Sequence, residues 1–386
     1  MSRKQTLTAA TMLVFIVMNF VSSMSGALFS AILDQVALEL GISVSQAGSL
    51  SSFYAYGAGI GVPVFLVLFH KYDRSMLLKA MLLLNIAVTA FLTIAGSFSS
   101  LLAARFLMGL SSNCYAVLAT ATIAALSPEE KVGRNLSVLI AGSASALMIG
   151  IPLTRALAKI LPWRNVFMIL IGLMLLSLVY FIFRLPSAGS DRKPVHLKDE
   201  LEFLKDKSVV IQLLLSMVTF IGYGGFYMYL TPYITEQYAA LEPYMSLILV
   251  LVGACSFAGN MLGGYVCDRA GYKKALLAGS LVQLLTASLM FVLKKAMIPS
   301  LVLVLLWMVN GWFIGLQINT GITIVTKNRS SLMISLNSSG IQLGQAVGAS
   351  IAAVIISSSG IGMISLLSIV CSAAAAGILL FTEKKA

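Results

Sequence analysis

The 386-residue sequence is poor in charged residues, and this shortage excludes most classes of soluble protein. Asp, Glu, Lys and Arg make up 10% of the chain, whereas soluble globular domains carry about 25%. Hydrophobic residues account for 59% of the sequence, and the mean hydropathy is +0.96. A chain with so little charge cannot cover its apolar surface in water, so we interpret it as an integral membrane protein.

Cysteine and histidine are also scarce, which argues against metal and covalent chemistry. The four cysteines show no C-x-x-C spacing, so neither a disulfide framework nor a zinc site is indicated. Both histidines, His70 and His196, fall in polar segments between apolar stretches, which removes the embedded His of an intramembrane metalloprotease. No embedded Ser–Lys arrangement is visible either. We therefore predict a protein that is not an enzyme and that carries no metal or cofactor.

Long apolar stretches are what the sequence has in abundance. A membrane-spanning helix needs about 20 apolar residues, and we mark about twelve such stretches. The first is too long for a cleavable signal peptide and lacks an A-x-A site after it, so we expect it to be retained. The stretches are 7–33, 45–69, 75–95, 99–125, 136–158, 163–183, 209–235, 244–266, 275–293, 300–325, 332–357 and 359–381.

The distribution of Lys and Arg predicts the orientation of these spans. Placing the N-terminus inside puts most basic residues in cytoplasmic loops and leaves Lys159, Arg164, Lys294 and Lys295 opposite. We therefore expect a multi-pass protein of the plasma (inner) membrane of a bacterial cell, with both termini cytoplasmic. The net charge of +12 reflects this topology and attraction to anionic lipids, and nucleic acid is not an expected partner.

The longest polar segment divides the chain into two similar halves. We expect an N-terminal six-helix bundle at 1–183, a cytoplasmic linker at 184–208 and a C-terminal six-helix bundle at 209–386. An Asp-Arg pair follows the second span of each half, as expected for an internal repeat. The predicted fold class is thus an all-α membrane protein of two pseudo-symmetric bundles. Glycine rows at Gly57, Gly59 and Gly61, at Gly259 and Gly263, and at Gly340, Gly344 and Gly348 predict close helix packing.

The segment "GGYVCDRAGYKKALLAG" (263–279) concentrates charge between two spans. Gly264, Asp268, Arg269, Gly271, Lys273 and Lys274 follow the spacing G-x-x-x-D-R-x-G-x-K-K, which resembles the loop signature of the major facilitator superfamily. We expect Gly264 to let a neighbouring helix approach, Gly271 to permit a tight turn, and Asp268 to accept hydrogen bonds. The loop is interpreted as a latch of the inner gate, with Asp73 and Arg74 as its counterpart in the first half; a simple topology anchor is the alternative.

The resemblance extends over nearly the whole chain. "RFLMGL" (105–110) resembles the family's R-x-x-x-G element, and "GIPL" (150–153) resembles the end of the antiporters' G-P motif. "GVPVFLVLFHKYDR" (61–74) and "SLNSSGIQLGQAVGASI" (335–351) are similar to the sugar-efflux and purine-efflux branch of the twelve-span drug/proton antiporters. The resemblance implies alternating access, export of a small solute and exchange against protons.

Few charges lie inside the predicted spans, and these are candidates for function. The efflux branch often places an acid where this chain has Gly26, and the nearest acid is Asp34. Asp34 and Arg105 are at similar depths, so we predict a proton-sensing pair, with a static salt bridge as the alternative. Arg155 either snorkels to the outer headgroups or contacts an anionic group of the substrate.

No acid occupies the middle of any span, which favours a neutral, zwitterionic or acid-bearing substrate over a cation. Amide and aromatic side chains cluster in the spans expected to face a central cavity. Thr219, Trp312, Asn319 and Gln345 belong to these clusters. As substrate-binding residues we select Asn113, Tyr115, Arg155, Tyr223, Tyr227, Trp307, Asn310, Gln317, Asn337 and Gln342.

Together these features predict a secondary active transporter that exports a small organic solute by proton-coupled antiport. A solute importer or uniporter of the same fold is the alternative, and a non-transporting membrane sensor is a remote one. The expected partners are the small-molecule substrate, protons and the lipid bilayer, and the expected state is a monomer.

Overall fold

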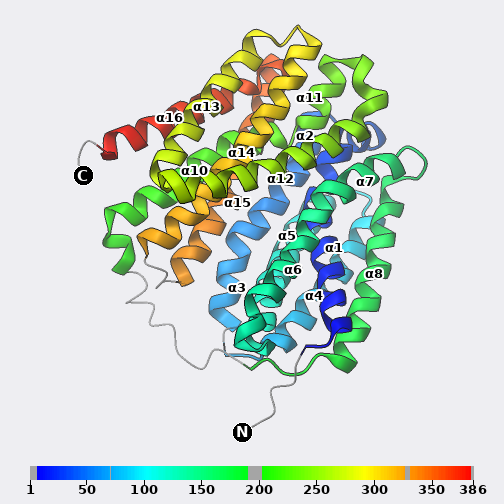
Figure 1. Cartoon of the computed structure of the whole chain (residues 1–386). Helices are drawn as coiled ribbons and strands as arrows, with labels where there is room; N and C mark the ends of the chain where they lie inside the picture. The colour runs from blue at the N-terminus through cyan, green and yellow to red at the C-terminus, as the bar shows by residue number, and fades with distance from the viewer. Residues whose placement is uncertain (1–6, 70, 190–201, 327–330, 384–386) are drawn as a thin grey trace. The chain divides into compact units, whose positions relative to one another are not determined.

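The computed structural model describes residues 7–69, 71–189, 202–326 and 331–383, and no strand occurs among them (Figure 1). The predicted all-α class is confirmed. In the first half the helices are α1 (Ala9–Leu40), α2 (Val44–Tyr56), α3 (Val62–Phe69), α4 (Arg74–Ile94), α5 (Phe98–Leu126), α6 (Val132–Ser145), α7 (Ile151–Leu157) and α8 (Trp163–Arg184). In the second half they are α10 (Lys207–Tyr227), α11 (Leu230–Gln237), α12 (Met245–Ala270), α13 (Tyr272–Val292), α14 (Met297–Val325), α15 (Ser331–Ser359) and α16 (Ser365–Glu383).

Within these described ranges, 12 helical segments are long and apolar enough to cross a bilayer, which confirms the predicted number of spans. The hydrocarbon core offers backbone groups no hydrogen-bonding partner, and a helix satisfies those groups within its own segment. The segments are Ala9–Leu40, Val44–Phe69, Arg74–Ile94, Phe98–Leu126, Val132–Leu157, Trp163–Arg184, Lys207–Tyr227, Ala239–Ala270, Tyr272–Val292, Met297–Val325, Met333–Ser359 and Ile361–Phe381.

Two span boundaries differ most from the prediction. The first span was expected to end at residue 33, but α1 continues to Leu40 across a non-helical residue, Ile32 (φ −128°, ψ 20°). The seventh was expected to continue to residue 235, but α10 ends at Tyr227 and α11 begins at Leu230. The break falls at Tyr229 (φ −108°, ψ 15°), just before Pro232, which lacks the N–H needed to continue a helix from the preceding turn. Hydropathy cannot report either change, because it measures side-chain polarity and not the backbone dihedral angles at Ile32 and Tyr229.

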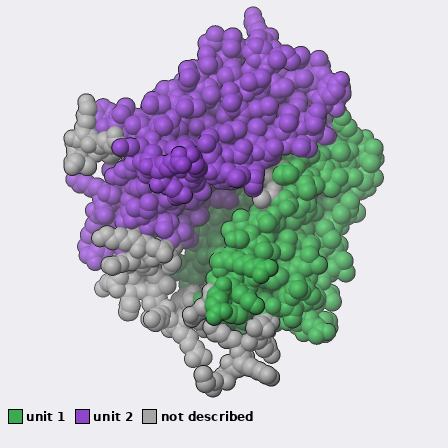
Figure 2. Space-filling model, viewed as in Figure 1, with its two compact units in different colours: residues 1–32, 53–194 green, residues 33–52, 195–386 purple. Residues whose placement is uncertain are grey.

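The chain forms two compact units, coloured separately in Figure 2. One unit contains Met1–Ile32 and Phe53–Pro194, and the other contains Leu33–Ser52 and Val195–Ala386. The boundary after Pro194 falls inside the expected linker, whereas the segment 33–52 groups with the second unit instead of the first half. Ile32, the non-helical residue of α1, lies at this boundary. Within the second unit, Ser45 Oγ donates to the Ala353 carbonyl at 2.8 Å.

Two spans of the first unit contain one π-helical turn each. The turns are Gly57–Gly61 in the second span and Ala146–Gly150 in the fifth. Each turn lies just before a proline, Pro63 or Pro152, whose ring and missing N–H disturb the regular helical hydrogen bonds. The wider turn absorbs the disturbance, and such turns are common at functional sites. The "GIPL" motif therefore marks a local irregularity in the backbone of the fifth span.

Glycines bring α10 and α15 of the second unit into close contact. A Cβ atom at Gly344 would lie 2.7 Å from the Met217 carbonyl oxygen, and one at Gly348 would collide with the Ile221 carbonyl oxygen. A Cβ atom at Gly340 would meet nothing nearer than 3.9 Å. The predicted packing role of this glycine row is confirmed at two of its three positions.

We expect Gly348→Ala to destabilise the protein, because the added methyl group meets backbone that cannot move aside. Overpacking of this kind costs roughly 1–3 kcal/mol. Gly340→Ala is the matched control on the same helix and should leave the midpoint of thermal unfolding in detergent, followed by near-UV circular dichroism, unchanged or slightly raised. Equal midpoints for the two variants would contradict the packing described here.

Candidate functional site

The second unit contains a cleft of about 400 Å³ between α10, α12, α14 and α15. Among the described residues that line it, none is acidic or basic. Four carry side-chain amides, three are aromatic and one is a serine. The lining residues are Phe220, Tyr223, Asn260, Gly311, Trp312, Gly315, Leu316, Asn319, Ser338, Ile341, Gln342 and Gln345. Tyr223 and Gln342 were among the selected residues, and Trp312, Asn319 and Gln345 belong to the wider predicted clusters.

Tyr223 is held at the wall of this cleft by its neighbours. Its ring is stacked with Trp307 at a centroid distance of 5.2 Å and an interplanar angle of 5°, and with Tyr227 at 5.3 Å and 18°. A Cβ atom at residue 311 would lie 2.7 Å from Tyr223 Cε2, so the ring occupies space that only glycine leaves free. Trp307 in turn donates from Nε1 to Ser368 Oγ at 2.9 Å. Trp307 and Tyr227 thus support Tyr223, and neither lines the cleft itself.

Two polar groups at this wall lack a hydrogen bond of normal geometry. The Tyr223 hydroxyl and the Trp312 Nε1 are both buried, and they lie close enough to interact without meeting hydrogen-bond geometry. Tyr223 itself is 8% exposed. Buried polar groups are normally paired, because leaving one unsatisfied costs about 1–3 kcal/mol. The cleft wall therefore contains two buried polar groups whose hydrogen-bonding capacity is not satisfied.

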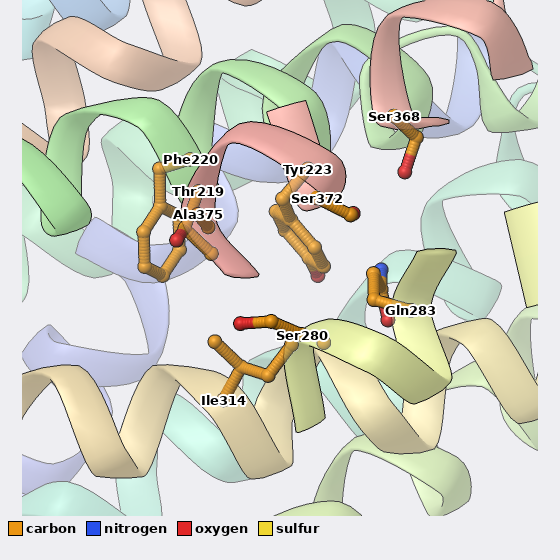
Figure 3. A pocket seen from close by; sticks show the side chains of 10 residues that line it. Thr219, Phe220, Tyr223, Ser280, Gln283, Ile314, Ser368, Ser372 and Ala375 are labelled. Atoms are coloured by element: carbon orange, nitrogen blue, oxygen red, sulfur yellow. The ribbon is translucent and has the colours of Figure 1, made fainter. Parts of the chain in front are cut away.

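A small enclosed chamber lies behind Tyr223, between α10, α13, α14 and α16 (Figure 3). Its volume of about 10 Å³ suits a single water molecule. Hydroxyl groups of Thr219, Ser280, Ser368 and Ser372 and the amide of Gln283 line it, and Thr219 Oγ1 has no hydrogen-bond partner. The chamber and the cleft share Phe220, Tyr223 and Gly311, so Tyr223 separates an open polar space from an enclosed one.

Three of the selected amides instead connect helices inside the second unit. Asn310 Nδ2 donates to the Gly279 carbonyl at 2.8 Å and to Gln283 Oε1 at 2.6 Å. Gln317 Nε2 donates to the Gly263 carbonyl at 2.9 Å, while its buried Oε1 has no partner. Asn337 Nδ2 donates to Asn319 Oδ1 at 3.1 Å, and its Oδ1 accepts from the Ser216 hydroxyl. Buried amides in helical bundles commonly serve this purpose.

In the first unit, Arg105 is completely buried and lies against aromatic rings. Its guanidinium carbon is 4.6 Å from the Phe29 ring centroid and 4.5 Å from that of Tyr54. It donates to the Ser25 carbonyl at 2.7 Å and the Gly26 carbonyl at 3.3 Å. Carbonyl dipoles and ring faces both stabilise a cation in a poorly hydrated site. The position at which the efflux branch often has an acid thus supplies Arg105 with a backbone carbonyl.

Asn113 and Arg105 converge on Tyr54, a residue of α2 that the sequence did not single out. Asn113 Nδ2 donates to the Tyr54 hydroxyl at 3.2 Å and to the Gly109 carbonyl at 2.9 Å. Tyr115, on the same helix as Asn113, is fully buried, and its hydroxyl has no hydrogen-bond partner. Single aromatic residues are common in apolar spans, so nothing in the sequence distinguishes Tyr54.

Arg155 does not snorkel to the headgroups. Its side chain is 0% exposed, and it donates from Nη1 to the Ala31 carbonyl at 3.3 Å. Ala31 precedes the non-helical Ile32, so Arg155 binds α1 beside its irregular turn. The snorkelling interpretation is therefore wrong, because the Arg155 side chain reaches a backbone carbonyl inside the first unit. An anion contact stays a prediction.

Asp34 belongs to the segment 33–52, which groups with the second unit. Within that unit its negative charge interacts electrostatically with Glu236 of α11. Partial burial and the neighbouring Asp34 charge both raise the pKa of Glu236 above its ordinary value. The repulsion from Asp34 disfavours the charged form of the Glu236 carboxyl group. Arg105 belongs to the first unit, and the pairing of Asp34 with Arg105 stays a prediction.

The loop before α4 binds the chain segment that follows α8. Asp73 caps α4 by accepting from the Met76 N–H at 2.9 Å, and it also accepts from Ser187 Oγ at 2.6 Å and the Gly189 N–H at 2.7 Å. Ser75 Oγ donates to the Pro186 carbonyl at 2.7 Å, and the Arg74 N–H donates to the Gly189 carbonyl at 3.0 Å. The first-half loop thus anchors the start of the expected linker. Sequence reasoning did not predict this contact.

The charged residues around the turn between α12 and α13 make fewer described contacts than those of the loop before α4. Gly271 has φ +79° and ends α12, which confirms the predicted tight turn. Asp268, Lys273 and Lys274 are exposed, and Arg269 lies over the Tyr265 ring at 4.0 Å. The close approach expected at Gly264 is wrong within this unit, since a Cβ atom there would lie 3.9 Å from Leu316 Cδ2. The α14 backbone approaches Gly259 and Gly263 instead, because those residues are on the helix face turned toward α14.

The spans, the internal division and a cleft lined by neutral polar groups are features of a secondary transporter. The chain belongs to the Major Facilitator Superfamily, whose sequence model matches residues 15–239 and 212–386. It is therefore a transporter, with a small-molecule substrate and the lipid bilayer as its partners.

Individual relatives agree with this assignment. The chain is 29% identical over 340 residues to the uncharacterized MFS-type transporter YbcL of Bacillus subtilis, covering 88% of this chain and 87% of the relative. It is 25% identical over 322 residues to the purine ribonucleoside efflux pump NepI of Salmonella paratyphi B, covering 83% and 80%. The crystal structure of a bacterial homolog of the lysosomal transporter Spinster, in an inward-facing and unoccupied conformation, matches with a TM-score of 0.70 and 13% identity over 97% of this chain and 96% of that one.

The hydrogen bonds of Asp73 lead to a pH-dependent prediction. Partial burial raises the pKa of its carboxyl group, but hydrogen bonds from Ser187 and from backbone N–H groups outweigh burial and bring the pKa below the ordinary value of 3.8. The stabilisation is therefore present above the pKa of the unfolded chain and is lost as the pH falls through the lower, folded-state pKa. We expect hydrogen exchange at the Gly189 amide to lose protection in that acidic window.

Asp73→Ala should remove the same protection at neutral pH, because it deletes the acceptor. Asp268→Ala is the matched control, since Asp268 is exposed at the equivalent motif position. Protection at Gly189 that survives in Asp73→Ala would show that the contact does not hold this segment.

Proposed function

We propose that this transporter exports a small organic solute from the cytoplasm by alternating access, in exchange for protons. The observation that carries the proposal is the cleft of about 400 Å³ whose described lining includes amide and hydroxyl groups but no charged group. The "GIPL" motif at the irregular turn of the fifth span and the efflux function in the name of NepI support export. We place the protein in the plasma membrane of a bacterial cell as a monomer, with both termini in the cytoplasm.

The lining of the cleft favours a neutral substrate over a cation. A cation would leave its hydration shell for a site with no carboxylate among the described lining residues, and that loss would not be offset. Zwitterionic and acid-bearing solutes stay candidates because Arg155 offers a buried guanidinium in the first unit. In this proposal Tyr223 and Gln342, the selected residues that line the cleft, bind the substrate in the second unit. Asn113, Tyr115 and Arg155 stay candidates for substrate contact in the first unit.

Asp34 is the proposed proton carrier, with Glu236 as its neighbour. The Asp34 charge acts on Glu236, and a neighbouring negative charge favours the protonated form of a carboxyl group. In the same proposal Arg105 responds to the protonation of Asp34. The loops containing Asp73, Arg74, Gly264, Asp268, Arg269, Gly271, Lys273 and Lys274 form the inner gate.

We expect substrate-triggered proton movement in proteoliposomes with an imposed pH gradient, tested with neutral, cationic and carboxylate-bearing solutes. Asp34→Asn should abolish the proton movement, since the amide cannot bind a proton reversibly. Glu39→Gln, which changes an exposed acid on the same helix, is the control and should leave the flux intact. Solute transport without proton movement in the wild type would indicate a uniporter.

We also expect Asp268→Asn to slow solute transport severalfold while leaving membrane insertion intact. The amide keeps the size of the side chain but removes the charge that a gate contact would use. Transport is measured by solute efflux from inverted vesicles, and insertion by the amount of protein in washed membranes. An unchanged rate would reduce the loop to an anchor that fixes the topology.

A further inference from the structure

The unsatisfied Tyr223 hydroxyl and Trp312 N–H at the cleft wall indicate which chemical groups a bound molecule would present to them. The Trp312 indole N–H can only donate, so its partner must offer an acceptor. The neighbouring Tyr223 hydroxyl can accept as well as donate, so the same partner can present an N–H beside that acceptor. An acceptor adjacent to a donor on one edge is the pattern of a carboxamide or a cyclic amide.

The rest of the lining is consistent with an uncharged, flat molecule. Phe220, Tyr223 and Trp312 contribute aromatic surface from α10 and α14, which suits a planar ring. In the described part of the chain, the side-chain amides of Asn260 and Gln345 form no hydrogen bond, and they approach the cleft from α12 and α15. A charged ligand would find no counter-charge among the described lining residues.

The position of the Tyr223 hydroxyl is set before any ligand arrives. Trp307 and Tyr227 stack with its ring, and Gly311 leaves the space that the ring fills. The chamber behind it supplies polar contacts for one water molecule instead of room for the ring to swing away. A preorganised group loses little conformational entropy on binding, so its hydrogen bond contributes more to affinity.

We propose that the cleft of the second unit binds an uncharged planar carboxamide or cyclic amide, with Trp312 donating to its carbonyl oxygen and Tyr223 accepting from its N–H. The inference rests on the proposed function, because it names the substrate class of the same transporter. Tyr223 and Trp312 are the residues that determine specificity in this half of the protein. Gly311, Trp307 and Tyr227 are positioning residues that act through Tyr223.

Three probes of the same shape test the predicted charge. Nicotinamide is a neutral planar carboxamide, nicotinate is its anionic counterpart and 1-methylnicotinamide is a cationic one. We expect purified full-length protein to bind radiolabelled nicotinamide saturably in a scintillation-proximity assay. The two charged analogues should compete at least ~10-fold less well, the factor expected when one charge is buried without a partner. No saturable binding, or equal competition by either charged analogue, would overturn the proposal.

Matched variants test the named atoms. Tyr223→Phe and Trp312→Phe keep an aromatic ring but remove the hydroxyl or the indole N–H, and each should weaken nicotinamide binding about tenfold. Gly311→Ala should weaken binding comparably, because the new methyl group displaces the Tyr223 ring. Gly377→Ala, where a Cβ atom meets nothing within 4 Å, is the control and should bind like the wild type. Wild-type affinity in both Phe variants would overturn the assignment.

The binding assay separates this inference from the proposed function. Proton-coupled export of another solute by a protein that does not bind nicotinamide would refute the substrate class and leave the exporter intact. Saturable nicotinamide binding that is lost in the variants, without any export from inverted vesicles, would refute the exporter and support the binding site. Thermal midpoints of all variants show whether a loss of binding reflects misfolding.

Discussion

The structure depends on a bilayer that offers backbone polar groups no hydrogen-bonding partner. Regular helices meet this constraint within their own segments, and irregular backbone is tolerated where protein supplies the missing partner. In the described residues, the helical spans depart from regular α-helix at Ile32, Gly57–Gly61, Ala146–Gly150 and Tyr229. Arg155 donating to the Ala31 carbonyl beside Ile32 is one example. At Ile32, the departure from regular helix therefore coincides with a side-chain contact from the fifth span.

The two halves use related sequence elements in different ways. In the first unit, an arginine is stabilised by carbonyl groups and aromatic rings, and the charged loop binds the segment after α8. In the second unit, aromatic stacking and glycine contacts hold one tyrosine at the wall of an uncharged cleft. The predicted internal repeat thus does not imply equivalent chemistry, because each side chain acquires its role from the groups packed around it.

Sequence reasoning succeeded where the signal is local. Hydropathy located the spans, and the charged-loop spacing placed the tight turn at Gly271. Sequence reasoning was less informative about which residues of a helix face a neighbouring helix or a cleft. Gly264 and Gly263 are adjacent in sequence, yet the α14 backbone approaches only Gly263 of the two. Trp307 and Trp312 both looked like cavity residues, yet only Trp312 lines the cleft. Such differences depend on helix rotation, which composition and spacing do not fix.

The amino-acid pattern alone is enough to show that the chain has about twelve apolar spans, that an Asp-Arg pair follows the second span and recurs after the eighth, and that charges inside the spans are few. These properties follow from the solvent and from short-range patterns. The folded structure was needed to show that Asp73 binds the segment after α8 and that Arg105 and Asn113 both contact Tyr54. It was also needed to show that Tyr223 and Trp312 lie at the same wall of the cleft. Each of these contacts joins helices far apart in the chain, because distances across a helical bundle are set by packing rather than by sequence separation.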